Sequence, residues 1–256
     1  MSTELPASAA VYNPFVLKLY DLWVTRFSNR FAWRCTADRQ IAHYRAHLRP
    51  RHLDVGVGTG FYLQGARAMG ARHVALVDPN PSCLATAQAR LSGVTSSVYC
   101  QDALHPLAID EPKFESIGLS YLLHCLAGPF ARKTAIFDNL APLLASDGVL
   151  FGTTILGSAA GHNALGRRLM TVYNAKGIFG NADDTIEELD KALRQRFRRV
   201  SVVQIGVVAL FSASADVAPL ANSQIPSMPR RALFKRATEL VRHRDASRAD
   251  KGAAGE

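Results

Sequence analysis

Residues 52–60 read HLDVGVGTG, a short apolar run that ends in three glycines at alternate positions. Glycine has no Cβ atom, so such a turn lets a ligand approach the backbone closely. A helix that follows the turn has free amides at its start, and these can donate hydrogen bonds to the ligand. The spacing differs from the dinucleotide pattern G-x-G-x-x-G, and an acid, Asp54, stands two residues ahead of Gly56. We therefore predict a strand, a ligand-binding turn and a helix here.

The rest of the chain alternates between short apolar runs and segments with helical spacing. Such alternation predicts an α/β fold, in which helices cover both faces of a mostly parallel sheet. The last two runs are joined by a short connection at Gly206, which favours a hairpin and an antiparallel last strand. We expect seven strands, at 52–57, 73–78, 96–102, 116–123, 148–156, 199–206 and 207–214, and helices at 62–69, 82–91, 129–144 and 184–197.

The flanking segments suggest a division into three parts. Residues 1–49 are expected to form an N-terminal helical cap, because apolar residues recur at helical spacing between 12 and 48. Residues 50–215 would form the main domain, with a glycine-rich insertion at 157–181 that contains a short helix at 165–173. Residues 216–256 would form a loop, a basic helix and a flexible tail.

Charge and composition restrict the class of protein. The formal net charge is +9, but Lys and Arg are concentrated in the C-terminal segment, where a solvated tail is favoured over a nucleic-acid-binding arm. The chain has no apolar run long enough to span a bilayer and no signal peptide, so we expect a cytoplasmic protein. Its four cysteines are scattered, which predicts free thiols and no metal site.

The turn resembles motif I of the class I S-adenosylmethionine (SAM)-dependent methyltransferases, whose pattern is acid-x-G-x-G-x-G. The resemblance covers roughly residues 51–156 and implies a Rossmann-like fold. It also implies that Gly56 and Gly58 lie against the amino acid part of SAM, and that Asp54 meets the ammonium group, directly or through water. SAM would be the cofactor and S-adenosylhomocysteine (SAH) the product.

Further matches follow at the family's spacing. By resemblance, Asp78 accepts hydrogen bonds from the ribose hydroxyls, and Asn80 lies near the adenine or the ribose. Asp102 would accept from the adenine amino group, with Ala103 against the ring, and Ser120 would line the methionine part. An acid at the end of a strand is also a common N-cap of the next helix, so capping remains open for both aspartates.

Residues that act on the acceptor are harder to identify, because methyl transfer requires little covalent chemistry from the protein. His124 is the candidate general base, although it could instead shape the SAM pocket. Tyr12 lies in an aromatic-rich segment that related enzymes place over the cofactor, and it is our candidate for the SAM carboxylate. Candidate substrate contacts are Tyr20, Trp33, His162 and Tyr173, for each of which ordinary packing or simple exposure is the alternative.

The predicted function is methylation of a small-molecule acceptor, with secondary metabolites as one source. The strand-four region lacks the Asn-Pro-Pro-Tyr and Asp-Pro-Pro-Tyr tetrapeptides of many amino-methylating enzymes, which weakens a nucleic-acid substrate. Two alternatives stay open: an RNA or protein methyltransferase, and a SAM-binding protein of this fold that catalyses another reaction. No membrane insertion is expected, and a homodimer is kept as one option for assembly.

Overall fold

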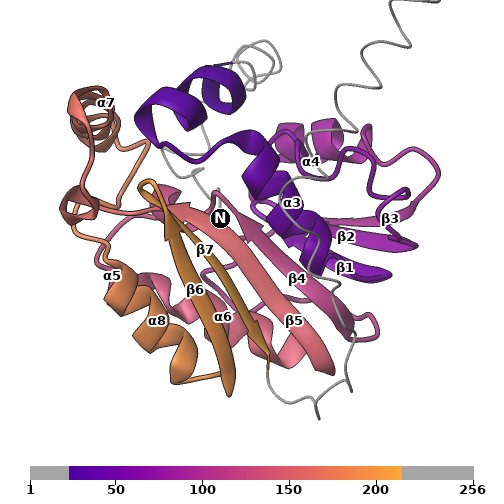
Figure 1. Cartoon of the computed structure of the whole chain (residues 1–256). Coiled ribbons are helices and arrows are strands. Elements are labelled where there is room, and N and C mark those ends of the chain that lie inside the picture. Colours follow the sequence, from indigo (N-terminus) through magenta and orange to yellow (C-terminus); the bar gives the residue numbers. More distant parts are fainter. Residues whose placement is uncertain (1–22, 215–256) are drawn as a thin grey trace, which may run out of the picture. The chain divides into compact units, whose positions relative to one another are not determined.

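The computed structural model describes residues 23–214 of the chain, with side chains from residue 27 onward. Within this part, seven strands form one sheet in the order β3-β2-β1-β4-β5-β7-β6. Figure 1 shows the strands side by side, with β3 at one edge and β6 at the other. Their bounds are β1 Arg51–Val55, β2 His73–Val77, β3 Thr95–Tyr99, β4 Phe114–Ser120, β5 Leu144–Ile155, β6 Arg199–Ile205 and β7 Val208–Ser214.

The strand directions confirm the predicted architecture. β1 pairs in parallel with β2 and β4, β2 with β3, and β4 with β5. β7 is antiparallel to both β5 and β6, so the predicted hairpin at Gly206 places β7 inside the sheet and β6 at its edge. Because β1 to β5 are parallel, the loops that follow them gather at one edge of the sheet, where open α/β sheets bind their ligands.

Helices cover both faces of the sheet, as predicted. On one face, Leu53 and Val55 of β1 belong to a hydrophobic cluster that also contains residues of α6 and α8, while on the other Leu76 of β2 belongs to a cluster with residues of α3 and α4. The helices, including short 3-10 segments and one π-helical segment, η1, are η1 Trp23–Ala32, α3 Ala37–His47, α4 Pro81–Gln88, η2 Leu123–Cys125, α5 Phe130–Lys133, α6 Ala135–Leu140, η3 Ala141–Leu143, η4 Ser158–Ala160, α7 Ala164–Ala175 and α8 Ile186–Arg194.

Two helix predictions were wrong in detail. Residues 61–70 form a series of tight turns in place of a regular helix, because Gly65 adopts a left-handed φ of +81° that an α-helix does not contain. The long helix predicted at 129–144 is divided into α5, α6 and η3. Near the first break, the Thr134 hydroxyl donates to the carbonyl of Ala131 at 2.8 Å, and such local bonds compete with continuous helix.

The predicted cap is described only from residue 23 onward, whereas the insertion at 157–181 is described in full. Helix α7 confirms the short helix predicted at 165–173, and the Asn163 side chain caps it by accepting from the Gly166 amide at 2.7 Å. Contacts divide the chain into units 1–217 and 218–256, of which the second, with the predicted basic helix, lies outside the described residues. Among residues 23–214, no helix is both long enough and apolar enough to cross a membrane.

Candidate active site

The glycine-rich turn joins β1 to the tight turns at 61–70 and lies beside the end of β2. The Gly56 amide donates to the carbonyl of Val77 at 2.8 Å, and the Gly58 amide donates to Asp78 Oδ2 at 3.3 Å. Gly58 has a φ of +50°, and a Cβ atom built there would meet nothing within 4 Å. Gly58 therefore presents bare backbone to open space at the carboxyl edge of the sheet.

Asp78 follows β2 and is almost wholly buried, with 7% of its surface exposed. Its Oδ1 accepts from the Asn80 amide at 2.8 Å, while Asn80 itself caps α4 by accepting from the Ser82 amide. Asp78 is thus not the N-cap of α4. Burial raises the pKa of Asp78 to about 6, against the opposing effect of the two donated amides, and the charge of Asp54 raises it further.

Asp54, near the end of β1, is the second buried carboxylate of this edge, with 5% of its surface exposed. Its Oδ2 accepts from the Tyr44 hydroxyl at 2.7 Å. Asp54 pairs in register with Leu76, two residues before Asp78, so the two carboxylates stand at the same end of adjacent strands, and each disfavours the charge of the other. A ligand that brings a positive charge and hydroxyl donors would relieve this repulsion.

Asp102 and Ala103 follow β3, as predicted. Asp102 Oδ1 accepts from the Leu104 amide at 2.9 Å, and Oδ2 lies 3.5 Å from His105 Nδ1. The Asp102 side chain is 35% exposed, whereas Ala103 is buried and its carbonyl accepts from the Asn139 side chain at 3.0 Å. Asp102 therefore stabilises its own turn and still offers an oxygen toward solvent.

Ser120 ends β4, and the residue after it has an unusual conformation. Tyr121 adopts a φ of +59°, which is rare for a residue with a side chain. Its amide donates to the Thr153 carbonyl at 2.8 Å, and its hydroxyl donates to Asn29 Oδ1 at 2.8 Å. Gln40 of α3 in turn donates to the Tyr121 hydroxyl oxygen at 2.7 Å. These bonds hold the end of β4 against the cap.

His124 lies in η2 and is buried, with 1% of its surface exposed. Its Nδ1 is 3.4 Å from the amide of Ile155 and from the Thr154 hydroxyl. A backbone amide can only donate, so Nδ1 accepts, and the neutral ring carries its proton on Nε2. Burial, with a smaller effect of the Lys133 charge, lowers the pKa of His124 to about 3. The imidazole is therefore neutral at physiological pH and a weak base.

The predicted substrate contacts divide into two groups. Trp33 and His162 are buried and pack edge to face at 5.9 Å, and His162 Nε2 is 3.0 Å from the carbonyls of Leu156 and Gly157. Tyr173 is half-buried and lies 5.0 Å from the Phe179 ring. Tyr20 lies outside the described residues, as does Tyr12, which was predicted to contact the SAM carboxylate and not the substrate.

Aromatic rings surround His124 on the side of the insertion. The Phe179 ring lies 4.6 Å from the imidazole and 6.1 Å from Trp33, while the Tyr121 ring lies 5.2 Å from the imidazole. Sequence reasoning missed Phe179, and it also missed Gln40 and Tyr44, since a polar residue on a predicted helix gives no sign of what it will contact. The rings form an apolar wall next to the end of β4.

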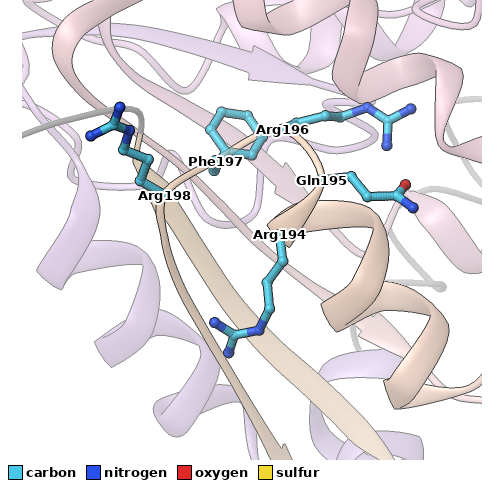
Figure 2. Close-up of a pocket in the computed structure, with 5 residues that line it drawn as sticks. All are labelled: Arg194, Gln195, Arg196, Phe197 and Arg198. Atoms are coloured by element: carbon cyan, nitrogen blue, oxygen red, sulfur yellow. The ribbon is translucent and has the colours of Figure 1, made fainter.

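A hollow of about 410 Å³ lies between α8 and β6 and is lined by Arg194, Gln195, Arg196, Phe197 and Arg198. It is near the amino end of β5, since Arg199 and Val149 both pair with Ser214, and so lies away from the edge with the two carboxylates. Figure 2 shows the three guanidinium groups pointing in different directions. Arg194 pairs with Asp190, and Arg196 pairs with Asp138, each at 2.6 Å. The hollow therefore does not gather its positive charges on one point.

Comparisons with known proteins agree with this geometry. A family model described as a methyltransferase domain matches residues 53–148. The physcion biosynthesis cluster O-methyltransferase of Aspergillus chevalieri is 36% identical over 213 residues, which cover 82% of this chain and 96% of that protein. The chain belongs to the class I SAM-dependent methyltransferases. This methyltransferase is also 33% identical to the demethylluteothin O-methyltransferase of Streptomyces thioluteus over 205 residues, covering 80% of this chain and 89% of that protein.

The fold of this methyltransferase is shared with solved structures of lower identity. The complex of DhpI with SAH superposes with a TM-score of 0.59 at 15% identity, covering 85% of this chain and 100% of that chain. The residues present also fit the cofactor. Bare backbone at Gly58 leaves room for it, and the buried Asp54 and Asp78 suit a ligand that carries an ammonium group and two hydroxyls.

The four cysteines all lie within the described residues. All four cysteines are free thiols, and burial raises the pKa of Cys83 and Cys125 to about 12. Across residues 23–214, no group of three or more His, Cys, Asp or Glu side chains is arranged to hold a metal ion.

Proposed function

We propose that this methyltransferase methylates a hydroxyl oxygen of a small aromatic or enolic molecule, with SAM as the donor. The proposal rests chiefly on the two neighbouring carboxylates, Asp54 and Asp78, beside the open backbone of Gly58. The acceptor class is supported by the relatives, because both proteins compared above are named O-methyltransferases. The aromatic wall around His124 supports a flat acceptor, since ring pairs favour stacked and edge-to-face contacts.

In this proposal, residues at the end of each strand contact a different part of SAM. Asp54 receives the ammonium group, and the amides near Gly56 and Gly58 lie along the amino acid part. Asp78, with Asn80 beside it, accepts from the ribose hydroxyls. The adenine lies against Ala103 with its amino group toward Asp102, and Ser120 lines the methionine part. SAM supplies an activated methyl group on its sulfonium.

His124 is proposed to donate a hydrogen bond from Nε2 to the acceptor oxygen. Its Nδ1 is occupied by the Ile155 amide, and no described residue accepts from Nε2. A hydrogen bond to an ionised oxygen favours the ionised form, so a donor at this place lowers the pKa of a phenol that binds against it. This role replaces the general base that the sequence predicted, since a ring with a pKa of about 3 removes protons poorly at neutral pH.

Replacing His124 by phenylalanine is expected to lower kcat about tenfold to a hundredfold, with SAH affinity changed less than about twofold. Glutamine, which can place an N–H near the position of Nε2, should retain more activity. The pH profile separates the two roles: a general base with an ordinary histidine pKa makes kcat fall below about pH 6.5, whereas the neutral donor proposed here leaves no such limb. The donor role would be contradicted if kcat of the wild-type enzyme fell at acidic pH and this fall were absent from both variants.

The function itself is tested with methyl-labelled SAM and a panel of acceptors. We expect label in phenolic and enolic compounds, and none in matched compounds whose hydroxyl is replaced by an amine or a hydrogen. Product analysis by mass spectrometry would locate the methyl group. Tight SAM binding with no methylated product from hydroxyl, amine or thiol acceptors would instead support the alternative of a SAM-binding protein with another reaction.

Cofactor binding is expected to weaken about tenfold between pH 7 and pH 5. The pKa of Asp78 is raised to about 6 in the free protein, so the carboxylate is ionised above that pH and protonated below it. Only the ionised form accepts from both ribose hydroxyls, so affinity is constant above pH 6 and falls as the pH decreases through it. Calorimetric titration with SAH measures the effect. An Asp78→Asn variant should bind SAH more weakly, and its affinity should depend little on pH. If its affinity still fell about tenfold between pH 7 and pH 5, the pH dependence would belong to a group other than Asp78.

We also propose that the enzyme works in the cytoplasm with a small molecule as its partner, and with neither nucleic acid nor membrane. The free cysteines are typical of a reducing compartment. The assignment of residues 1–49 as a cap, 50–215 as the SAM-binding domain and 216–256 as a tail stays a prediction. So does the option of a homodimer, which light scattering on the purified chain would settle.

A further inference from the structure

We propose that Tyr44 and His52 are positioning residues for the cofactor, because a chain of buried hydrogen bonds through them holds the Asp54 carboxylate. The inference rests on the proposed function, in which Asp54 receives the ammonium group. Neither Tyr44 nor His52 belongs to the glycine-rich turn, and neither is itself proposed to touch the cofactor. Tyr44 comes from α3, which the sequence assigned to the cap.

The chain of contacts runs from the backbone to the carboxylate. The Arg49 amide lies 3.0 Å from Ser116 Oγ, which lies 2.8 Å from His52 Nδ1. His52 Nε2 lies 2.8 Å from the Tyr44 hydroxyl, which lies 2.7 Å from Asp54 Oδ2. The side chains of Tyr44 and His52 are wholly buried, and that of Asp54 is 7% exposed. These bonds are therefore shielded from competing water.

Chemistry allows one direction of donation along this chain. The Tyr44 hydroxyl donates its single hydrogen to Asp54, so its oxygen can only accept from His52 Nε2. With the ring hydrogen on Nε2, His52 Nδ1 accepts from the Ser116 hydroxyl, and the Ser116 oxygen in turn accepts from the Arg49 amide. Each donor polarises the next, which strengthens the last bond to the carboxylate.

The sheet provides the space and the alignment for this chain. His52 and Asp54 are two residues apart on β1, so their side chains leave the same face of the sheet, beneath α3. Ser116 is the direct neighbour of His52 on β4, and Gly118 is the neighbour of Asp54. A Cβ atom at Gly118 would lie 3.1 Å from the His52 ring, so glycine leaves room for the imidazole.

As a consequence, Asp54 Oδ2 accepts from Tyr44, and Asp54 Oδ1 is left for the ammonium group of the cofactor. Among the described residues, none donates a hydrogen bond to Asp54 Oδ1. Without the Tyr44 hydroxyl, the carboxylate would lose the donor that fixes its rotation, although the phenyl ring would still fill the core beside Phe151. The docking of α3 is in this way coupled to the amino acid end of the cofactor site and not to its adenosine end.

The experiment compares two ligands on full-length protein by calorimetric titration. SAH carries the amino acid part, whereas 5′-methylthioadenosine has the same adenosine and lacks it. Tyr44→Phe is expected to weaken SAH about tenfold and methylthioadenosine less than about twofold. In an Asp54→Asn background the same change should cost almost nothing further, because Tyr44 acts through the charge of Asp54.

Tyr99→Phe is the matched control. It also removes a hydroxyl that donates to a carboxylate, Glu111 at 2.6 Å, and it packs on the opposite face of the sheet with Val77. It should leave both affinities within about twofold. Ser116→Ala, which removes the first side-chain donor without altering the core volume greatly, is expected to weaken SAH binding alone by about threefold, and it serves if Tyr44→Phe folds poorly.

The results separate the inference from the function on which it rests. Equal losses for both ligands in Tyr44→Phe, or an unchanged SAH affinity, would overturn the positioning role while wild-type binding kept the function standing. An unchanged SAH affinity in Asp54→Asn would overturn the ammonium contact, and the role of Tyr44 with it. If the wild-type protein bound neither ligand, the proposed function would itself be overturned.

Discussion

Replacing Asp78 by alanine is expected to weaken SAH binding by at least about a hundredfold, or about 2.7 kcal/mol. The carboxylate is proposed to accept from two ribose hydroxyls, and hydrogen bonds to a buried charge are each worth about 1.5–3 kcal/mol. Its removal also leaves the Gly58 and Asn80 amides without their acceptor. Stability should change little, because the raised pKa of Asp78 shows that its ionised form is a cost to the free protein near neutral pH.

Two further variants define the effect. Asp78→Asn keeps the volume and one acceptor oxygen, so a smaller loss of about tenfold is expected. Asp147→Ala removes an exposed aspartate in the first part of β5, before its apolar run, and should leave SAH binding unaltered. Calorimetry on all three, with thermal unfolding as a check on folding, gives the comparison. Wild-type affinity in Asp78→Ala would refute the proposed mode of cofactor binding.

Replacing Lys133 by methionine is expected to lower the free energy of unfolding by about 3–5 kcal/mol at neutral pH. Lys133 Nζ lies 2.6 Å from Asp184 Oδ2 and 2.7 Å from the Gly180 carbonyl, and the two side chains are 1% and 7% exposed. Methionine preserves the packing but leaves Asp184 buried and unpaired. For a unit of this size, such a loss corresponds to a decrease in Tm of roughly 10 °C.

The pH dependence gives this prediction a second readout. Burial raises the pKa of Asp184 even with Lys133 present, and removal of the lysine charge raises it further. An aspartate with a raised pKa destabilises the fold where it is ionised, so the deficit of the variant should narrow as the pH falls from 7.5 to 5. The double variant Lys133→Met/Asp184→Leu should recover most of the stability, because no unpaired charge remains.

Arg194→Met provides the control for a charge removed from a pair. Arg194 bonds to Asp190 at 2.6 Å, but the guanidinium is exposed, so its loss should leave Tm unchanged within error.

The buried pair of Lys133 and Asp184 has a further role in the site. The backbone carbonyl of Asp184 accepts from the Gly157 amide at 2.7 Å, and the Gly180 amide donates to the His124 carbonyl at 2.9 Å. The Lys133 variant should therefore also lose activity, and an unaltered Tm would show that the pair is not needed.

Much of the fold could be predicted from the sequence because its signals are local. Alternation of apolar runs with helical spacing determines an α/β sheet, and the short connection at Gly206 determines the final hairpin. Helix interiors were less certain: nothing in the letters of 61–70 showed that Gly65 would be left-handed, and the break near Thr134 depends on a hydroxyl that bonds back to its own helix.

The sequence by itself determined where the proposed cofactor site lies, because a glycine turn and Asp78 follow consecutive strands, Asp54 stands near the end of the first of them, and parallel strands bring their carboxyl ends together. Only the tertiary structure decided how those groups are held. Tyr44 meets Asp54 and Lys133 meets Asp184 through contacts between separate elements, and the neutral state of His124 depends on burial that no local pattern contains. Such contacts arise when whole helices pack on the sheet, so they are set by the fold and not by neighbours in the chain.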